Sequence, residues 1–265
     1  MCQRSYDGTM PSQAVEVVEL LARRATLLRL LRERPRLKRE LAEELSVSRS
    51  TVDRAVRNLE ATDYVARGET VSLTLEGRLA LDAFEQFTGV IRGLDDTSRV
   101  LEHLPESATL DVSMLRDATV VTPDRDAPQR PIASFVEEAE RATKVRGFGS
   151  AVLPSVVSVF RDRIVDHDAV FDLTVPESVL DELLASQRGV VEECLDSGRL
   201  TLRTASTSLD YSLLLVEQRD RTAVCALVYG DSGVAGVVKN DTDDAVRWAD
   251  RVYERLRKDA TDLPV

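Results

Sequence analysis

Residues 36–75 contain two short helical patterns, separated by a three-residue break and followed by a stretch that alternates apolar and polar residues. The first pattern runs over 39–45, and its apolar residues fall on one helix face: Leu41, Ala42 and Leu45. Ser46-Val47-Ser48 interrupts the periodicity, and the Ser48 hydroxyl is suited to accept a hydrogen bond from the first turn of a new helix. The segment therefore predicts a helix, a three-residue turn and a second helix.

The second helical pattern has an apolar back and a polar front. The residues of the back recur at i, i+3, i+4 and i+7: Val52, Ala55, Val56 and Leu59. At 100° per residue, the opposite face carries Ser50, Arg54 and Arg57, with Thr51 and Asp53 beside it. A plain surface helix with solvated charges is the alternative to a face that binds something.

The neighbouring segments complete a recognisable order of elements. Residues 20–31 form an apolar helical run that predicts the first helix of a three-helix core. Residues 64–75 predict two short strands around Gly68-Glu69, because Val71, Leu73 and Leu75 alternate with polar residues. A hairpin directly after such a helix is a wing, so residues 15–76 predict a winged helix-turn-helix preceded by a flexible N-terminus over 1–14.

This arrangement places one helix in the major groove of double-stranded DNA. Arginine can bridge guanine edges or pair with phosphate, and serine and threonine hydroxyls can contact either group. Arg67 at the tip of the wing is placed to reach a phosphate or the minor groove. The residues that we expect to contact DNA are Lys38, Ser48, Arg49, Ser50, Thr51, Arg54, Arg57 and Arg67.

The distribution of charge supports this hypothesis, although the net charge of −11 at first argues against it. Residues 20–76 hold 12 Lys and Arg against 9 Asp and Glu, whereas residues 77–265 hold 22 against 34. The basic excess therefore lies on the segment that is predicted to bind DNA, as an electrostatic footprint requires.

The remaining composition predicts a cytoplasmic protein. There is no run of 18 apolar residues and no signal-peptide pattern at the N-terminus. The three cysteines are scattered, with neither metal-ligand spacing nor a disulfide framework, so we expect no metal, no cofactor and no membrane contact. Cys194 and Cys225 are candidate oxidant sensors, but buried, inert thiols are the more common reading.

The second half of the chain predicts a mixed α/β sheet covered by helices. Residues 77–104 form an apolar helical segment that we expect to connect the domains and to mediate dimerisation. Gly89 and Gly93 are expected to make the middle of this helix more flexible. The alternative is a linker that packs only on its own chain. From residue 105 to 260, strands and helices alternate and then give way to three strands over 211–217, 223–229 and 234–239. Helices are expected over 132–143, 154–167, 177–197 (broken near Gly189) and 243–257.

The chain resembles a family of archaeal winged-helix regulators that carry the effector domain of the methanogenesis regulatory protein. The resemblance covers residues 15–258 and rests on the order of several segments: S-V-S-R-S-T-V-D-R-A-V-R-N-L-E, L-R-D-A-T-V-V-T-P, P-I-A-S-F-V-E-E-A-E-R-A-T-K-V-R-G, G-R-L-T-L-R and V-V-K-N-D-T-D-D-A-V-R-W-A-D-R-V-Y-E-R-L-R. The preference for Arg over Lys, 31 to 4, within an acidic chain also resembles proteins of salt-loving archaea. The resemblance implies transcription control and a regulatory domain similar to the phospholipase D fold, hence an α+β or α/β two-domain protein.

The hydrolases of that fold need an H-x-K pair, and neither histidine here has one: His103 is followed by Leu-Pro and His167 by Asp-Ala. We therefore expect no enzymatic activity and no catalytic residue. A ligand pocket is expected at the carboxyl ends of the strands. The candidate residues there are Phe148, Gly149, Ser150, Thr174, Pro176, Thr207, Tyr211, Tyr229 and Asp231; ordinary loop chemistry is the alternative for each.

The leading hypothesis is a homodimeric, one-component regulator in which a small-molecule effector or partner bound to the second domain alters DNA binding. The second hypothesis is a DNA-binding scaffold whose second domain only dimerises or recruits a protein. An enzyme tethered to DNA is the third.

Overall fold

The computed structural model describes residues 12–206, 209–231 and 233–263, and it divides into two compact units, Met1–Thr88 and Gly89–Val265. The division falls inside the helix that was expected to connect the domains. Residues 1–11 of the expected N-terminal segment and Thr207 lie outside the described residues.

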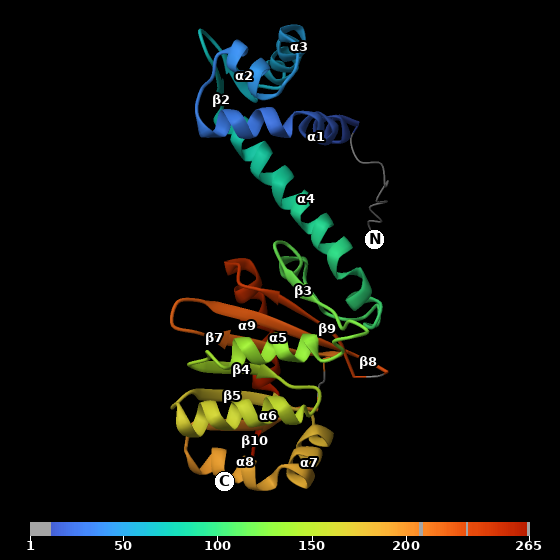
Figure 1. Ribbon diagram of the computed structural model, residues 1–265, viewed down its shortest axis with the longest axis vertical. Coiled ribbons are helices and arrows are strands. Elements are labelled where there is room, and N and C mark those ends of the chain that lie inside the picture. Colours follow the sequence, from blue (N-terminus) through green and yellow to red (C-terminus); the bar gives the residue numbers. More distant parts are fainter. Residues whose placement is uncertain (1–11, 207–208, 232, 264–265) are drawn as a thin grey trace, which may run out of the picture. The chain divides into compact units, whose positions relative to one another are not determined.

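The N-terminal unit consists of helices and one short hairpin (Figure 1). Its elements are α1 (Ser12–Glu33), α2 (Lys38–Glu44), α3 (Arg49–Glu60), β1 (Val65–Arg67), β2 (Val71–Leu73) and the start of α4 (Leu75–Leu101). A single apolar core joins them, and every residue of the predicted α3 stripe is at most 2% exposed. The strands β1 and β2 pair antiparallel across Gly68-Glu69, so the predicted order of helix, turn, helix and wing is confirmed.

Arg36 connects the turn between α1 and α2 to the wing by hydrogen bonds. Its backbone exchanges two hydrogen bonds with Val71 of β2, at 3.0 and 2.8 Å. Its guanidinium is buried and pairs with Glu33 and Glu44, while Nε donates to the carbonyl of Leu30 at 3.0 Å. A charge removed from water must be paired to be tolerated, and Arg36 has three acceptors.

The C-terminal unit is built on an eight-stranded mixed sheet in the order β10-β6-β5-β4-β7-β8-β9-β3 within the described residues. The strands are β3 (Thr119–Val121), β4 (Lys144–Phe148), β5 (Val170–Val175), β6 (Leu200–Thr204), β7 (Tyr211–Glu217), β8 (Thr222–Gly230), β9 (Gly233–Asn240) and β10 (Thr261–Asp262). Only β4, β5 and β6 run parallel to one another; every other pairing is antiparallel. The predicted change from alternating strands and helices to successive strands produces this mixture.

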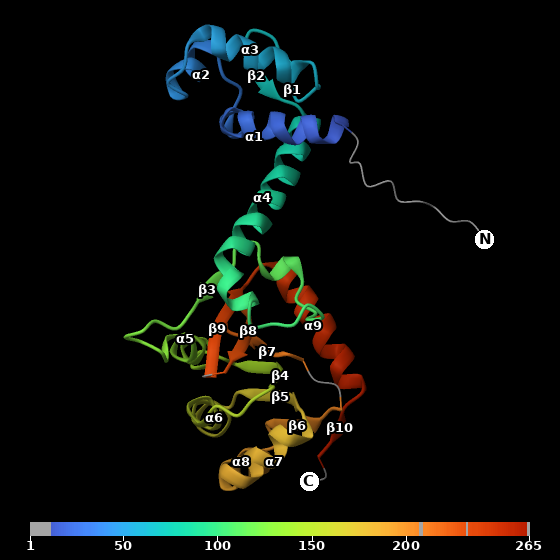
Figure 2. The same ribbon diagram turned by 90° about the vertical axis from the view of Figure 1, so that its right-hand side faces the viewer.

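Helices cover both faces of the sheet (Figure 2). They are α5 (Arg130–Ala139), α6 (Pro154–Arg161), α7 (Glu177–Ser186), α8 (Arg188–Asp196) and α9 (Asp243–Lys258). α5, α6 and α8 pack on one face, whereas α9 packs on the other through Trp248, Ala249 and Tyr253. The strands β7 and β8 lie between the two layers, which explains why nearly all of their residues are buried.

Three local features differ from the sequence prediction. The helix expected over 177–197 breaks at Gln187, two residues before Gly189. The helix expected over 154–167 ends as α-helix at Arg161 and continues as a π-helical turn over Asp162–Asp166. The short strand β10 was not predicted, because two polar residues at a sheet edge leave no periodic signal.

Gly93 has a different role from the one expected. α4 continues through it, so the residue does not break the helix. A Cβ at this position would lie 1.9 Å from the carbonyl oxygen of Leu115, a distance that no side chain tolerates. Glycine therefore allows the 112–115 turn to pack directly on the helix backbone.

We expect Gly93→Ala to lower the stability of the C-terminal unit by about 1–3 kcal/mol, because overpacking outweighs the better helix propensity of alanine. Urea unfolding followed by the fluorescence of Trp248, the only tryptophan of the chain, measures the change. Gly189→Ala in α8 is the matched control, since nothing lies within 4 Å of its added Cβ. An unchanged midpoint for Gly93→Ala would show that the contact with Leu115 imposes no constraint.

Candidate nucleic-acid interface and effector cavity

Ser48 organises the start of α3. Its hydroxyl accepts a hydrogen bond from the backbone N–H of Thr51 at 3.2 Å, as predicted for an N-cap. The same oxygen lies 2.8 Å from the hydroxyls of both Ser50 and Thr51. Three exposed hydroxyls are thus gathered at the end of the helix where free backbone N–H groups attract phosphate.

The front of α3 carries cations that are not neutralised by acidic side chains. Arg49 and Arg54 are exposed and have no ion-pair or hydrogen-bond partner among the described residues. Arg57 is also exposed, and its Nε donates only to the carbonyl of Asp53, at 3.2 Å. The guanidinium charges of this face therefore remain available to an external anion.

Several other arginines of the N-terminal unit pair with carboxylates. Arg29 and Arg32 each lie 2.7 Å from Glu85, and Arg34 lies 3.4 Å from Glu40. Hydrogen bonds from Arg29 and Arg32 hold the pKa of Glu85 below its usual value, although partial burial opposes the shift. Arg39 of α2 is exposed and, like Arg49 and Arg54, has no carboxylate partner among the described residues. The unit therefore carries both paired and unpaired arginines, and α3 contributes two of the unpaired ones.

Lys38 and Arg67 differ from the other predicted DNA contacts because each already has an acidic neighbour. Lys38 forms an ion pair with Asp53, and its hydrogen bond lowers the pKa of that carboxyl group. Arg67 ends β1 and lies 3.9 Å from Glu60. Either side chain would have to exchange this partner for a phosphate, whereas Arg49 and Arg54 would not.

We expect Ser48→Ala to destabilise the N-terminal unit by about 1 kcal/mol, because an N–H of the first turn loses its acceptor. Ser48→Asp should retain the cap and keep stability near that of the wild type, since a carboxylate also interacts favourably with the helix dipole. Thermal unfolding followed by circular dichroism compares the two variants. Equal losses of stability in both would contradict the capping role.

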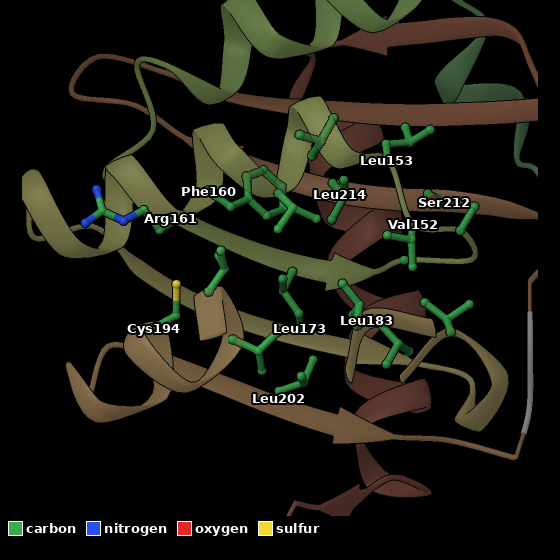
Figure 3. Close-up of a pocket in the computed structure, with 18 of the residues that line it drawn as sticks. Val152, Leu153, Phe160, Arg161, Leu173, Leu183, Cys194, Leu202, Ser212 and Leu214 are labelled. Atoms are coloured by element: carbon green, nitrogen blue, oxygen red, sulfur yellow. The ribbon is translucent and has the colours of Figure 1, made fainter. Parts of the chain in front are cut away.

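The C-terminal unit contains an apolar cavity of about 110 Å³ between α6, α7, α8 and the facing strands (Figure 3). Its wall is made mainly of aliphatic and aromatic side chains. Figure 3 shows Leu173 and Leu202 of the sheet directed toward the helices, with Cys194 of α8 on the same wall. Burial raises the pKa of the Cys194 thiol to about 11, so it contributes a neutral, apolar surface near pH 7.

One side of the cavity is polar. The Ser212 hydroxyl and the Tyr229 hydroxyl, both from lining residues, are 2.7 Å apart. The backbone N–H of Ser150 donates to the Ser212 oxygen at 2.9 Å. Burial raises the pKa of Tyr229, so its phenol is neutral at physiological pH.

The predicted effector residues fall into three groups. Gly149 and Tyr229 line the cavity, and Ser150 joins its polar side. Phe148, Thr174 and Tyr211 are wholly buried and do not line it; Tyr211 belongs to the core on the α9 face. Pro176, which precedes α7, and the exposed Asp231 are not part of its wall. Thr207 is outside the described residues.

The sequence analysis did not predict most of the residues that line the cavity. The prediction considered only the carboxyl ends of strands, whereas α6, α7 and α8 supply much of the lining, including Phe160, Leu183 and Val190. Their apolar periodicity predicts helix burial, but a buried helix face and a cavity wall have the same residue pattern.

Thr174 is fully buried, and its hydroxyl has no hydrogen-bond partner among the described residues. We expect Thr174→Val to stabilise the C-terminal unit by about 1 kcal/mol, because it removes an unsatisfied polar group with little change of shape. Urea unfolding monitored by Trp248 fluorescence tests this. Thr201→Val, at an exposed position of the neighbouring strand, is the control and should change little. Destabilisation by Thr174→Val would reveal a partner for the hydroxyl.

Other kinds of site find no support within the described residues. They contain no group of three or more His, Cys, Asp or Glu side chains placed to hold a metal ion. The thiol of Cys225 is buried and its pKa is raised by burial to about 12, which disfavours the reactive thiolate. No helix in the described ranges has the length and apolar character needed to cross a membrane.

Comparison with protein families assigns both parts of the chain. Residues 12–96 match the HVO_A0261 N-terminal domain. Residues 128–259 match the middle domain of the methanogenesis regulatory protein FilR1. The C-terminal unit thus carries the middle domain of that regulatory family. The resemblance identified from the sequence is thereby confirmed.

Several solved structures are distantly similar, whereas no curated protein sequence matches. TrmBL2, described as an archaeal chromatin protein with a novel mode of DNA binding, shares 15% identity over 94% of this chain and 99% of its own, with a TM-score of 0.43. Nuc from Salmonella typhimurium, a phospholipase D family member, shares 10% identity over 56% of this chain and 99% of its own, with a TM-score of 0.42. NucT from Helicobacter pylori shares 8% identity over 55% and 98%, with a TM-score of 0.44. These similarities are too distant to carry an argument about this chain.

Proposed function

We propose that the protein is a sequence-specific, double-stranded-DNA-binding regulator of transcription that works as a single component. The observation that carries the proposal is α3, where Arg49 and Arg54 are exposed and unpaired, whereas Arg29 and Arg32 of α1 are paired with Glu85. α3 would enter the major groove, and the hydroxyls of Ser48, Ser50 and Thr51 would lie closest to base edges or phosphates.

The DNA-bound form is proposed to be a homodimer, because two-fold symmetry of the protein matches paired half-sites in DNA. Large apolar side chains on α1 and α4 of the N-terminal unit support this: Val18 is 39% exposed, Leu79 55% and Phe87 56%. Val18 and Phe87 line a shallow apolar groove formed by these two helices and Tyr64. Association of two copies would remove this surface from water.

The C-terminal unit is proposed to sense a small-molecule effector and to lack enzymatic activity. The apolar cavity with one polar side supports ligand binding in preference to a scaffold that only recruits a protein. Regulation requires that the effector bind more tightly to one state of the protein than to another. The protein is proposed to act in the cytoplasm, where the DNA is.

Genome-wide crosslinking and sequencing of the tagged protein, in cells grown at their native salt concentration, tests the regulatory function. Sharp peaks that share a motif with two related half-sites are the expected outcome. The experiment is repeated under altered growth conditions. A diffuse signal with no shared motif under every condition would contradict sequence-specific binding.

Arg54→Ala should weaken binding to a fragment from such a peak by about tenfold, within the range expected for one arginine contact to a base or phosphate. Fluorescence anisotropy over a series of salt concentrations measures it, and loss of a phosphate contact should also reduce the salt slope by about one. Arg32→Ala is the matched control, because Arg32 is already paired with Glu85 and Asp82. Equal effects of the two substitutions would contradict the assignment of α3 as the recognition helix.

A further inference from the structure

We propose that the C-terminal cavity binds a small, uncharged, mainly apolar molecule that carries a single hydroxyl or carbonyl group, of the size of a simple phenol. The inference deepens the proposed ligand sensing and rests on it for its regulatory meaning, but the binding itself is independent of DNA. Size, charge and hydrogen-bonding capacity of the site each restrict the ligand.

The volume of the cavity limits the size of the ligand. The cavity measures about 110 Å³, and apolar cavities of roughly 150 Å³ in protein cores accommodate benzene. Drug-sized ligands occupy clefts of about 300–1,000 Å³. The site is therefore smaller than a cavity that encloses benzene. It fits a short branched chain, or one ring whose substituent extends toward the open side, and it does not enclose a nucleotide or an oligosaccharide.

The cavity is reachable from solvent. Leu173 lies on β5 between two neighbouring strands and under the helical layer, yet its side chain remains partly exposed. Phe160 and Val190, from α6 and α8, are also partly exposed and line the same space. These apolar side chains keep some contact with water although they lie under the helical layer. An apolar ligand that replaces this water lowers the free energy of the system.

The wall offers no free charge. Arg161 is the only charged residue among the described lining residues, and Figure 3 shows its guanidinium directed away from the apolar side chains. It is paired with Glu193 at 2.5 Å and Asp166 at 2.6 Å. An anionic ligand would leave its charge without a partner in an apolar site, which is costly.

The polar side accepts one neutral group. The Tyr229 hydroxyl shares hydrogen bonds with the Ser212 and Ser150 hydroxyls, and Ser212 also accepts from the Ser150 N–H. Each hydroxyl can donate and accept, so this group can rearrange to bond with one neutral ligand group. A ligand hydroxyl or carbonyl placed there would be recognised, while the rest of the molecule would lie against hydrocarbon.

Isothermal titration calorimetry of the full chain with p-cresol, toluene and p-toluate tests this inference. These probes share one methyl-substituted ring and differ in carrying a hydroxyl group, no polar group or a charge. We expect p-cresol to bind about five to ten times more tightly than toluene, as one added hydrogen bond predicts. Binding of p-toluate should be weaker than that of p-cresol by at least about tenfold.

Two variants test whether p-cresol binds in the cavity. Val190→Phe should abolish p-cresol binding by filling the space, and Tyr229→Phe should reduce the p-cresol affinity to that of toluene. Tyr211→Phe, which removes a buried hydroxyl on the other face of the sheet, is the matched control and should leave binding unchanged. The thermal midpoint of each variant verifies that it folds.

Absence of p-cresol binding by the wild type, tighter binding of p-toluate, or p-cresol binding that both cavity variants leave intact would overturn the proposed ligand class. Those results would leave the DNA-binding proposal untouched, because crosslinking tests it separately. If p-cresol binds as expected but leaves operator affinity unchanged, the cavity assignment is supported and its role in regulation is contradicted.

Discussion

Burial of apolar side chains on one face of each helix is the constraint on which both units depend. In α3, Val52, Ala55, Val56 and Leu59 are removed from water, and this fixes which way the helix faces. The polar face must then point outward, with Ser50, Arg54 and Arg57 exposed. The same residues that stabilise the N-terminal core therefore orient the surface proposed to contact DNA. Substitutions in the stripe should impair both properties together, whereas substitutions on the front should separate them.

In the C-terminal unit, the same constraint acts on a sheet that is apolar on both faces. β7 and β8 contribute alternate side chains to the core under α9 and to the core under α5, α6 and α8. The α9 face is closed by large side chains such as Trp248 and Tyr253. The opposite face is covered less completely, because the helical layer is divided at Gln187 and at the π-helical turn after Arg161. The cavity lies among these shorter segments, and its existence follows from how several helices share one sheet face.

Electrostatic pairing distinguishes the two kinds of site. On α3 the guanidinium groups of Arg49 and Arg54 are left without carboxylate partners, so an external phosphate meets a free charge. At the cavity, Arg161 is surrounded by Asp162, Asp166 and Glu193, so the neighbouring wall presents no net positive charge. A protein rich in arginine thus contains both a surface with unpaired guanidinium groups and an uncharged cavity. Composition alone does not separate them, since both environments contain arginine.

The sequence by itself determined the order of elements in both units, because helical and strand periodicities depend only on local spacing. It placed α2, α3, the Ser48 cap, the wing and the strands β7 to β9 near their observed bounds. It also identified the outward residues of α3, since an amphipathic stripe defines its own opposite face. The tertiary structure alone decided which cations remain unpaired, because Glu85 and Arg29 are 56 residues apart in the chain. It likewise decided that Gly93 serves close packing against Leu115, and that Tyr229 and Ser212 meet beside a cavity walled by helices. These features depend on distances between residues remote in sequence, which periodicity does not encode.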